Sequence, residues 1–294
     1  MQESADNLRI TTKASSPLVS SLKKISKNRL AMLGLIVMIT IIAVSLLAPF
    51  LTPFEPDGVS IREKLEKPSV NHPLGTDKLG RDVLTRILYG GRMSILIGML
   101  SAVGCGVIGI GLGAFSGYGG GVFDRVLLRV SEVFMSFPQT LLILLFVSLI
   151  GQGITNLFIV FIATGWSSPY RLVRGKYLSM REENYVDACI AFGVRRTSIM
   201  FRHILPNTLG PIMVNVTAHV AMFILAESAL SFLGLGVPSS VVTWGNLLTS
   251  AKEVTTVKNY PWLWLPAGLT LSLFVLSINF LGDGLRDIFD PSSR

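Results

Sequence analysis

The chain has 294 residues, of which 50% are hydrophobic and only 15% are charged, and its net charge is +8. Soluble domains are roughly a quarter charged, so this composition excludes an ordinary cytosolic enzyme and a disordered or collagen-like chain. Two cysteines cannot support a disulfide framework, and three histidines leave little for a metal site. In a chain this apolar, the positive charge indicates a membrane protein with basic cytoplasmic loops rather than a nucleic-acid-binding protein.

Long apolar segments follow one another along the chain. A bilayer core about 30 Å thick needs roughly 20 apolar residues in a helix. Residues 30–51 and 93–117 meet this requirement without a single Lys, Arg, Asp or Glu. We expect six spans in all, within residues 30–51, 93–117, 126–150, 154–166, 209–233 and 263–281. The sequence therefore predicts an all-α, polytopic membrane protein with six transmembrane helices, the fourth being short and ending at Ser167-Ser168-Pro169.

The basic residues predict how these spans are oriented. If the N-terminus is cytoplasmic, the inner segments hold seventeen of the 26 Lys and Arg residues. Cytoplasmic loops are enriched in these residues, so we expect both termini inside. An outer loop at 53–92 is a local exception, because it carries seven bases beside six acids. The chain thus divides into a cytoplasmic N-terminal segment, 1–29, and a transmembrane domain, 30–294, with an inner loop at about 182–207.

The second span is rich in small residues at a spacing of four. They form two runs: Gly98, Ala102 and Gly106, then Gly109, Gly113 and Gly117. Small residues at this spacing let helices approach closely in lipid. The plain interpretation is packing within this chain, and the alternative is a contact with a helix of another subunit.

The inner loop at 182–207 has the pattern of a compact projection. Residues 185–192 lack Gly and Pro and predict a short helix. Gly193 suits a helix C-terminus or tight turn, and residues 195–203 predict a second short helix. Pro206 then lies where a proline can open the next helix. As an alternative, many inner loops are basic merely because of membrane topology.

This loop resembles the EAA loop of ABC importer permeases, whose pattern is E-A-A, three residues, G, nine residues, I, one residue, L-P. Asp187 replaces the Glu, Cys189 replaces the second Ala, and His203 stands at the Ile position. The resemblance assigns coupling to an ATPase to Asp187, Ala188, Cys189, Gly193, His203, Leu205 and Pro206.

Other segments narrow the resemblance to one branch of that family. They are HPLGTD at 72–77 with LGRD at 79–82, RHILPN at 202–207, ESALSFLGLG at 227–236 and LGDGLRD at 281–287. Together they resemble the C-type permease subunit of dipeptide and oligopeptide importers, over about residues 20 to 291. The same family includes nickel importers, so a nickel or other small-solute permease is the alternative.

The resemblance implies a type I importer fold in a bacterial or archaeal cytoplasmic membrane. It also implies a second permease subunit, two cytoplasmic ATPase subunits and an extracytoplasmic substrate-binding protein. The chain has no Walker lysine motif, so we expect no enzymatic activity and no cofactor of its own, with ATP and Mg bound by the ATPase subunits.

Polar residues inside the spans are candidates for the translocation path or its gate. Asn215 and His219 are four residues apart and share a helix face, with His219 roughly 15 Å into the fifth span. A buried, satisfied histidine is the plain alternative. Glu227 lies roughly 27 Å along, near the outer face, which suits a gate or interfacial residue. An intramembrane hydrolase using His219 with Glu227 and a simple channel are less favoured functions, since no nucleophile motif stands beside either residue and a channel leaves the inner loop unexplained.

Overall fold

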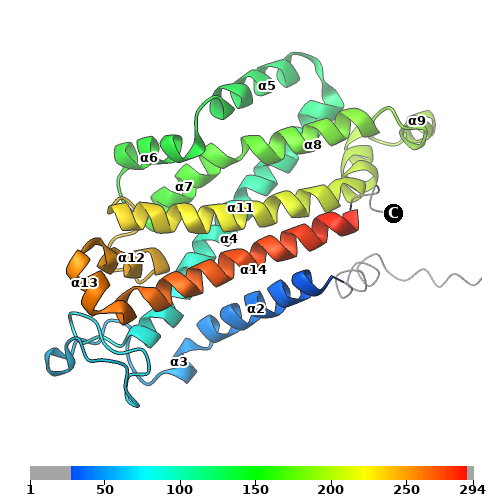
Figure 1. Ribbon diagram of the computed structural model, residues 1–294. Coiled ribbons are helices and arrows are strands. Elements are labelled where there is room, and N and C mark those ends of the chain that lie inside the picture. The colour runs from blue at the N-terminus through cyan, green and yellow to red at the C-terminus, as the bar shows by residue number, and fades with distance from the viewer. Residues whose placement is uncertain (1–27, 290–294) are drawn as a thin grey trace, which may run out of the picture.

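The computed structural model describes residues 28–289, which are built from helices that run broadly along one direction (Figure 1). Within this range there is no strand, and the only bridge of strand type joins Thr76 to Asp82. The predicted all-α class is confirmed. Residues 1–27 of the predicted N-terminal segment lie outside the described residues, as do residues 290–294.

Four long helices form the frame: α2 (Arg29–Leu46), α4 (Val83–Gly119), α11 (Leu205–Leu233) and α14 (Leu265–Phe289). The shorter elements are α3 (Ala48–Leu51), η1 (Ile61–Glu63), α5 (Gly121–Met135), α6 (Gln139–Ile150), α7 (Ile154–Gly165), α8 (Ser167–Met180), α9 (Asn184–Ala191), α10 (Arg196–Ser198), the π-helix η2 (Ile199–Ile204), α12 (Trp244–Leu248), η3 (Thr249–Lys252), α13 (Val254–Asn259) and η4 (Pro261–Leu263).

Each of the six expected spans corresponds to a helical segment. Within the described residues, four helices are long and apolar enough to cross a membrane, and α5 with α6 makes a fifth span if this pair, bent by 90°, is counted as one. The expected fourth span is α7. The helical path does not stop at Ser167-Ser168-Pro169 as predicted. Trp166 keeps helical backbone angles, and α8 follows directly after α7. Pro169 stands in the first turn of α8, and its missing N–H interrupts the helical hydrogen bonds at the junction of α7 and α8.

The second span is part of a longer helix than its apolar run indicated. α4 has 37 residues, about 55 Å, and begins ten residues before the predicted start at 93. Asp82 sets this start, since its Oδ2 accepts a hydrogen bond from the backbone N–H of Thr85 at 2.7 Å. The other oxygen, Oδ1, lies 2.9 Å from Nδ1 of the buried His72. The first turns of α4 therefore belong to what was predicted as an outer loop, because apolarity marks only the part of a helix that lies in lipid.

The glycines of α4 pack within the chain, as the plain interpretation predicted. A Cβ on Gly113 would lie 2.7 Å from Val173 Cβ of α8, and a Cβ on Gly98 would lie 2.3 Å from Ile224 Cγ1 of α11. The absence of these side chains lets α8 and α11 approach the α4 backbone closely.

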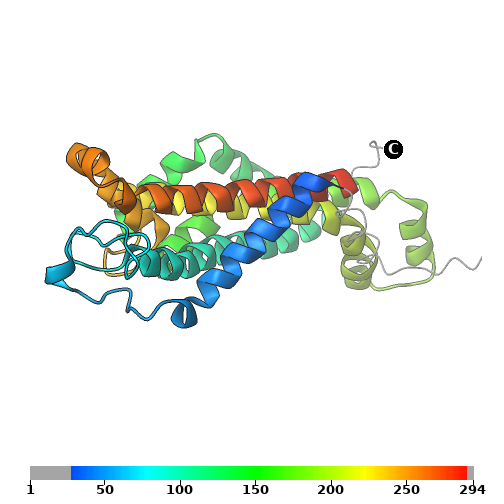
Figure 2. The same cartoon turned by 60° about the horizontal axis from the view of Figure 1, so that its bottom comes forward.

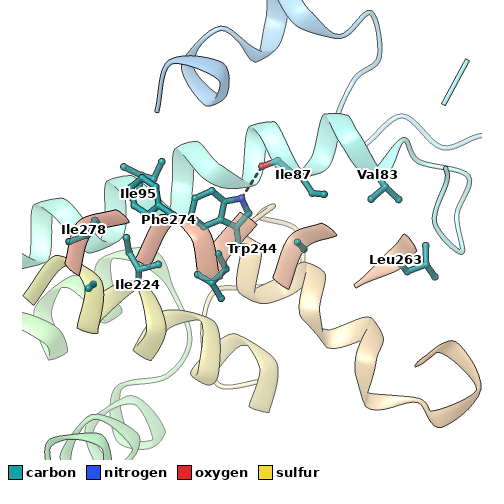
Figure 3. Packing of buried hydrophobic residues seen from close by; sticks show 11 residues of the cluster. Val83, Ile87, Ile95, Ile224, Trp244, Leu263, Phe274 and Ile278 are labelled. Atoms are coloured by element: carbon teal, nitrogen blue, oxygen red, sulfur yellow. Dashed lines mark hydrogen bonds between the residues drawn. The ribbon is translucent and has the colours of Figure 1, made fainter. Parts of the chain in front are cut away.

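A second contact layer joins α4, α11 and α14 at the end of the bundle that carries α12. Figure 3 shows Trp244 of α12 inserted between Ile87 of α4 and Phe274 of α14, with its indole Nε1–H donating to the Ile87 carbonyl at 3.0 Å. Burying this large ring with its N–H paired fixes α12 against the frame.

The two ends of the bundle differ in what they carry. Figures 1 and 2 place α9, the start of α2 and the end of α14 at one end, and residues 53–82 with α12 and α13 at the other. Asn28 Nδ2 donates to Asp287 Oδ2 at 3.1 Å, which holds the described ends of the chain together. The predicted inner and outer loops thus lie at opposite ends of the molecule.

Candidate functional site

The projection at the α9 end is built around Gly193, where the backbone has φ of +69°. The Val194 N–H donates to the Cys189 carbonyl at 3.0 Å, and the Gly193 N–H donates to the Ile190 carbonyl at 2.9 Å. These two bonds form the Schellman motif that closes a helix C-terminus, so Gly193 ends α9 in the way its sequence position predicted. A Cβ at Gly193 would meet no atom within 4 Å, so the need for glycine comes from the backbone angle.

One side of α9 is anchored to the bundle. Val186 is fully buried, in a cluster that includes Val173 of α8 and Ile199 of η2. The Tyr177 hydroxyl donates to the Met200 carbonyl at 2.8 Å and fastens α8 to η2. Since several buried side chains and a buried hydrogen bond hold it, the projection is a rigid part of the bundle.

The other side of α9 is open. Asp187 and Ala188 are exposed, and Cys189 is half-buried against the cluster. Beyond them, Phe192 is 87% exposed and Ile190 is 55% exposed. α9 and its C-cap residue Phe192 therefore present large apolar side chains together with one acid, which is the composition of a surface that docks another protein.

The second short helix differs from its prediction. α10 passes into the π-helix η2, which passes into α11 without an interruption, because Ile204 and Leu205 both have helical backbone angles. Pro206 stands in the first turn of α11, as predicted, and His203 and Leu205 are half-buried beside it. Proline has no N–H to donate, and the wider π-turn before it, closed by the Leu205 N–H on the Met200 carbonyl, accommodates that loss.

The side chains of Asn215 and His219 make hydrogen bonds to different partners. His219 is buried, and its Nδ1 donates to the Asn215 carbonyl of the same helix at 2.8 Å. Asn215 donates from Nδ2 to Ser168 Oγ of α8 at 3.2 Å, while its buried Oδ1 has no hydrogen-bond partner among the described residues. Asn215 also lines a cavity of about 550 Å³ between α8, α11 and α14, together with Lys176 and Arg286.

Glu227 is fully buried near the α12 end of α11. Ser231 Oγ donates to its Oε1 at 2.8 Å, and Ser94 Oγ of α4 donates to its Oε2 at 3.3 Å. Ser94 also accepts a hydrogen bond from the Trp244 backbone N–H at 3.0 Å. A carboxylate surrounded by hydroxyl donors thus joins α4, α11 and the start of α12. Glu227 and His219 bond to separate partners.

A partly buried ion pair near the projection was not predicted. Arg174 Nη2 of α8 donates to Asp124 Oδ2 of α5 at 2.7 Å, and Ser116 of α4 donates to the same carboxylate. Tyr170 Oη lies 3.0 Å from Ser116 Oγ and extends the network. Asp124 was visible in the sequence as an acid at the edge of an apolar segment, but its partner is 50 residues away.

Comparisons with known proteins agree with this architecture. Residues 109–294 match the family described as the inner membrane component of binding-protein-dependent transport systems, and residues 16–68 match the N-terminal transmembrane domain of oligopeptide transport permease C. The chain is 37% identical to the dipeptide transport system permease protein of Alkalihalophilus pseudofirmus over 281 residues, 96% of this chain and 92% of that protein. It is 34% identical to the oligopeptide transport system permease protein of Bacillus subtilis over 290 residues, 98% of this chain and 94% of that protein.

A helical, multi-pass membrane protein with a projection of short helices at one end is the class that the fold and the site define. The chain belongs to the family of binding-protein-dependent transport inner membrane components, and it has the type I fold of ABC importer permeases. It is thus a transport permease that works in a complex with other subunits.

Proposed function

We propose that this chain is the permease subunit through which an ATP-driven importer moves di- or oligopeptides. The relatives are named as dipeptide and oligopeptide permeases and align over nearly their whole length. The observation in the structure that carries the proposal is the rigid α9 projection with its exposed Phe192, at the end of the bundle opposite α12. The nickel-permease alternative has no particular support from the described residues.

The proposed complex has three kinds of protein partner. A second permease subunit forms the path with this chain, two ATPase subunits dock on the projections, and an extracytoplasmic binding protein delivers the peptide. ATP and Mg are bound by the ATPase subunits, and this chain contributes no catalytic group. We place it in the cytoplasmic membrane, with α9 and both termini in the cytoplasm, in accord with the basic inner loops.

Coupling follows from how the projection is attached. Val186 ties α9 to the cluster around η2, and η2 continues into α11. A displacement of α9 by a closing ATPase pair is therefore transmitted along α11, because a packed helix moves as a unit rather than deforming. Asp187 and Ala188 on the exposed side, with Gly193 fixing the turn, are the residues we assign to this contact.

The path residues are proposed on α11. Asn215 borders the inner cavity and keeps an unused acceptor, which suits contact with a polar solute. His219 lies one turn further out and supplies polarity near the middle of the span. Glu227 is proposed as part of the outer gate, since its hydroxyl cage holds α4, α11 and α12 closed upon one another.

Copurification of ATPase subunits with the tagged chain tests the docking surface. Phe192→Ser removes the most exposed apolar side chain of the projection, and Val254→Ser is the matched control, since Val254 is 68% exposed on α13 at the opposite end. Truncating an interface hot spot costs about 2 kcal/mol or more, so we expect roughly 30-fold weaker retention of the ATPase for Phe192→Ser alone. Equal retention in both variants would remove α9 as the docking surface.

A further inference from the structure

A small cavity lies at the α12 end, between the first turns of α4 and the segment from α12 to η4. Its volume is about 240 Å³. Val83 and Leu263 form part of its wall and lie at the outer edge of the cluster drawn in Figure 3. The polar residues that line it are Asp77, Lys78, Arg81, Arg86, Asn246, Thr249, Ser250 and Glu253.

Arg86 is the unusual member of this lining. It is only 4% exposed, yet its Nε and Nη1 have no hydrogen-bond partner among the described residues. The nearest carboxylates, Asp77 and Asp57, lie 3.6 and 3.9 Å from Nη1, beyond hydrogen-bond distance. A buried cationic donor without an acceptor is costly, so such a group is a candidate for binding a ligand that supplies one.

The remaining polar side chains of the cavity are already engaged. Arg81 Nε donates to Asp77 at 2.7 Å, and Lys78 is hydrogen-bonded to Glu253. Asn246 Nδ2 is within 2.8–3.3 Å of three backbone carbonyls, and the hydroxyls of Thr249 and Ser250 donate to carbonyls of their own segment. Among the described residues that line this cavity, the buried donors without a hydrogen-bond acceptor are therefore Nε and Nη1 of Arg86.

Charge and size narrow the class of ligand. Three bases and two acids line the cavity, which favours an anion of one charge over a phosphate dianion. Among monoanions, a carboxylate fits a guanidinium best, because the planar N–H donors of the guanidinium can reach both carboxylate oxygens. One water molecule occupies about 30 Å³ in the liquid, so a cavity of about 240 Å³ has room for only a few small groups. It admits a carboxylate with a small side chain but not a whole oligopeptide.

We propose that Arg86 and this cavity bind the C-terminal carboxylate of a peptide at the outer mouth of the permease. The inference rests on the proposed peptide transport. A linear peptide carries this group whatever its sequence, so such a contact recognises peptides as a class without reading their side chains. Arg86 then acts as a specificity-determining residue, while Lys78 and Arg81, each paired with its own acid, shape the cavity.

The test compares trialanine with its C-terminal amide in proteoliposomes that contain the full complex and one and the same binding protein. The quantity measured is the ratio of uptake rates, acid over amide, in wild type and in Arg86→Gln. Any preference of the binding protein is common to both complexes and cancels. A charge-assisted hydrogen bond corresponds to roughly tenfold or more in affinity, so we expect the ratio to fall by about tenfold in Arg86→Gln and by less in Arg86→Lys.

Arg92→Gln is the matched control. It removes the same charge from the same helix, but Arg92 Nε donates to the Ser45 carbonyl at 2.7 Å, and Arg92 does not line the cavity. We expect it to change the uptake of both peptides by the same factor. If Arg86→Gln lowered the uptake of trialanine and of its amide by the same factor, or lowered neither, the proposal would be overturned. Arg86 would then have a structural role only.

A second measurement covers the case in which Arg86→Gln does not assemble. Trialanine added to the detergent-solubilised wild-type complex, without binding protein, should raise its Tm more than the amide does at equal ionic strength. No difference between the two peptides overturns the carboxylate site. Peptide transport itself is judged separately, by whether wild type takes up trialanine at all, so its failure and that of the site are distinguishable.

Discussion

Gly193 shows how a single backbone angle can set the geometry of the α9 projection. We predict that Gly193→Ala destabilises the left-handed turn by about 1–2 kcal/mol, since a Cβ disfavours positive φ even where space is free. The turn should then loosen α9, so that ATP hydrolysis continues while uptake falls. Parallel assays of ATPase activity and uptake measure this.

Gly175→Ala is the control for that substitution. Gly175 also has open space around its Cβ position, but it lies within α8 with ordinary helical angles. Alanine is the better helix former there, so stability and coupling should be kept. If both variants behave alike, the left-handed angle is not what coupling depends on.

His219 allows the path proposal to be separated from simple packing. Leucine keeps most of its bulk but removes the hydrogen bond from Nδ1 to the Asn215 carbonyl. We predict that His219→Leu assembles normally and lowers uptake or alters the range of peptides taken up, because a polar group near the middle of the span is lost. Unchanged uptake and an unchanged peptide range would show that the histidine only fills space beside Phe223.

Among single residues, the sequence predicted positions better than partners. The glycine turn at 193 and the place of Glu227 near the α12 end of α11 followed from local pattern and helical rise. The cage around Glu227 did not, because Ser94 lies 133 residues away and its hydroxyl is brought there only by the packing of α4 on α11. The burial of Arg86, with two donors left without a hydrogen bond, was hidden for the same reason, since a basic residue in a loop is ordinarily solvated.

Helix contacts carry the next prediction. A Cβ on Gly113 would lie 2.7 Å from Val173 Cβ and 2.8 Å from the Tyr170 carbonyl oxygen. Both neighbours belong to α8 and cannot move without shifting it. We predict that Gly113→Ala lowers the stability of the assembled complex by about 1–3 kcal/mol through overpacking, measured as a lower denaturation midpoint in detergent.

Gly111→Ala gives the comparison two residues away on the same helix. A Cβ there meets nothing within 4 Å, so the substitution should be neutral or slightly stabilising. A loss of stability as large as that of Gly113→Ala would mean that α4 tolerates no side chain for reasons other than its contact with α8.

At the scale of elements, apolar runs located the spans but not their ends or bends. α4 and α8 extend beyond the lipid-facing segments because capping and packing, rather than hydropathy, decide where a helix stops. The bend of 90° between α5 and α6 surrounds Pro138, yet a proline in a sequence does not reveal the angle. Small residues on α4 indicated close packing, and only the structure identified α8 and α11 as the partners.

Across the whole molecule, one ion pair links the predicted outer loop at 53–92 to the N-cap residue of α13. Lys78 donates to Glu253 over 175 residues of sequence, and this bond, with one from Thr256, holds the pKa of the Glu253 carboxyl below its usual range. A lowered pKa means that the bond stabilises the folded state above the unfolded pKa of about 4.3 and is lost as the pH falls through the folded value.

We therefore predict that the outer loop opens more readily in acid. Relative to the intrinsic exchange rate at each pH, hydrogen-exchange protection around residues 60–80 should fall between pH 6 and pH values below about 4, and Glu253→Gln should show the reduced protection already at pH 6. The pair is exposed and screened by salt, so high ionic strength should reduce the difference. Protection that does not change with pH in wild type would assign no role to this link.

Membrane orientation is the property of the whole molecule on which the proposed coupling and the proposed carboxylate site both depend. The predicted outer loop carries seven bases, against the rule that bases stay inside, but it lies at the end of the bundle opposite α9. Val70, which is 99% exposed in that loop, offers a direct test. In a Cys105→Ala, Cys189→Ala background, Val70→Cys should react with an impermeant thiol reagent added outside intact cells. Thr197→Cys, exposed beside α9, should react only after the membrane is permeabilised. The reverse labelling pattern would place α9 outside, where no ATPase could reach it.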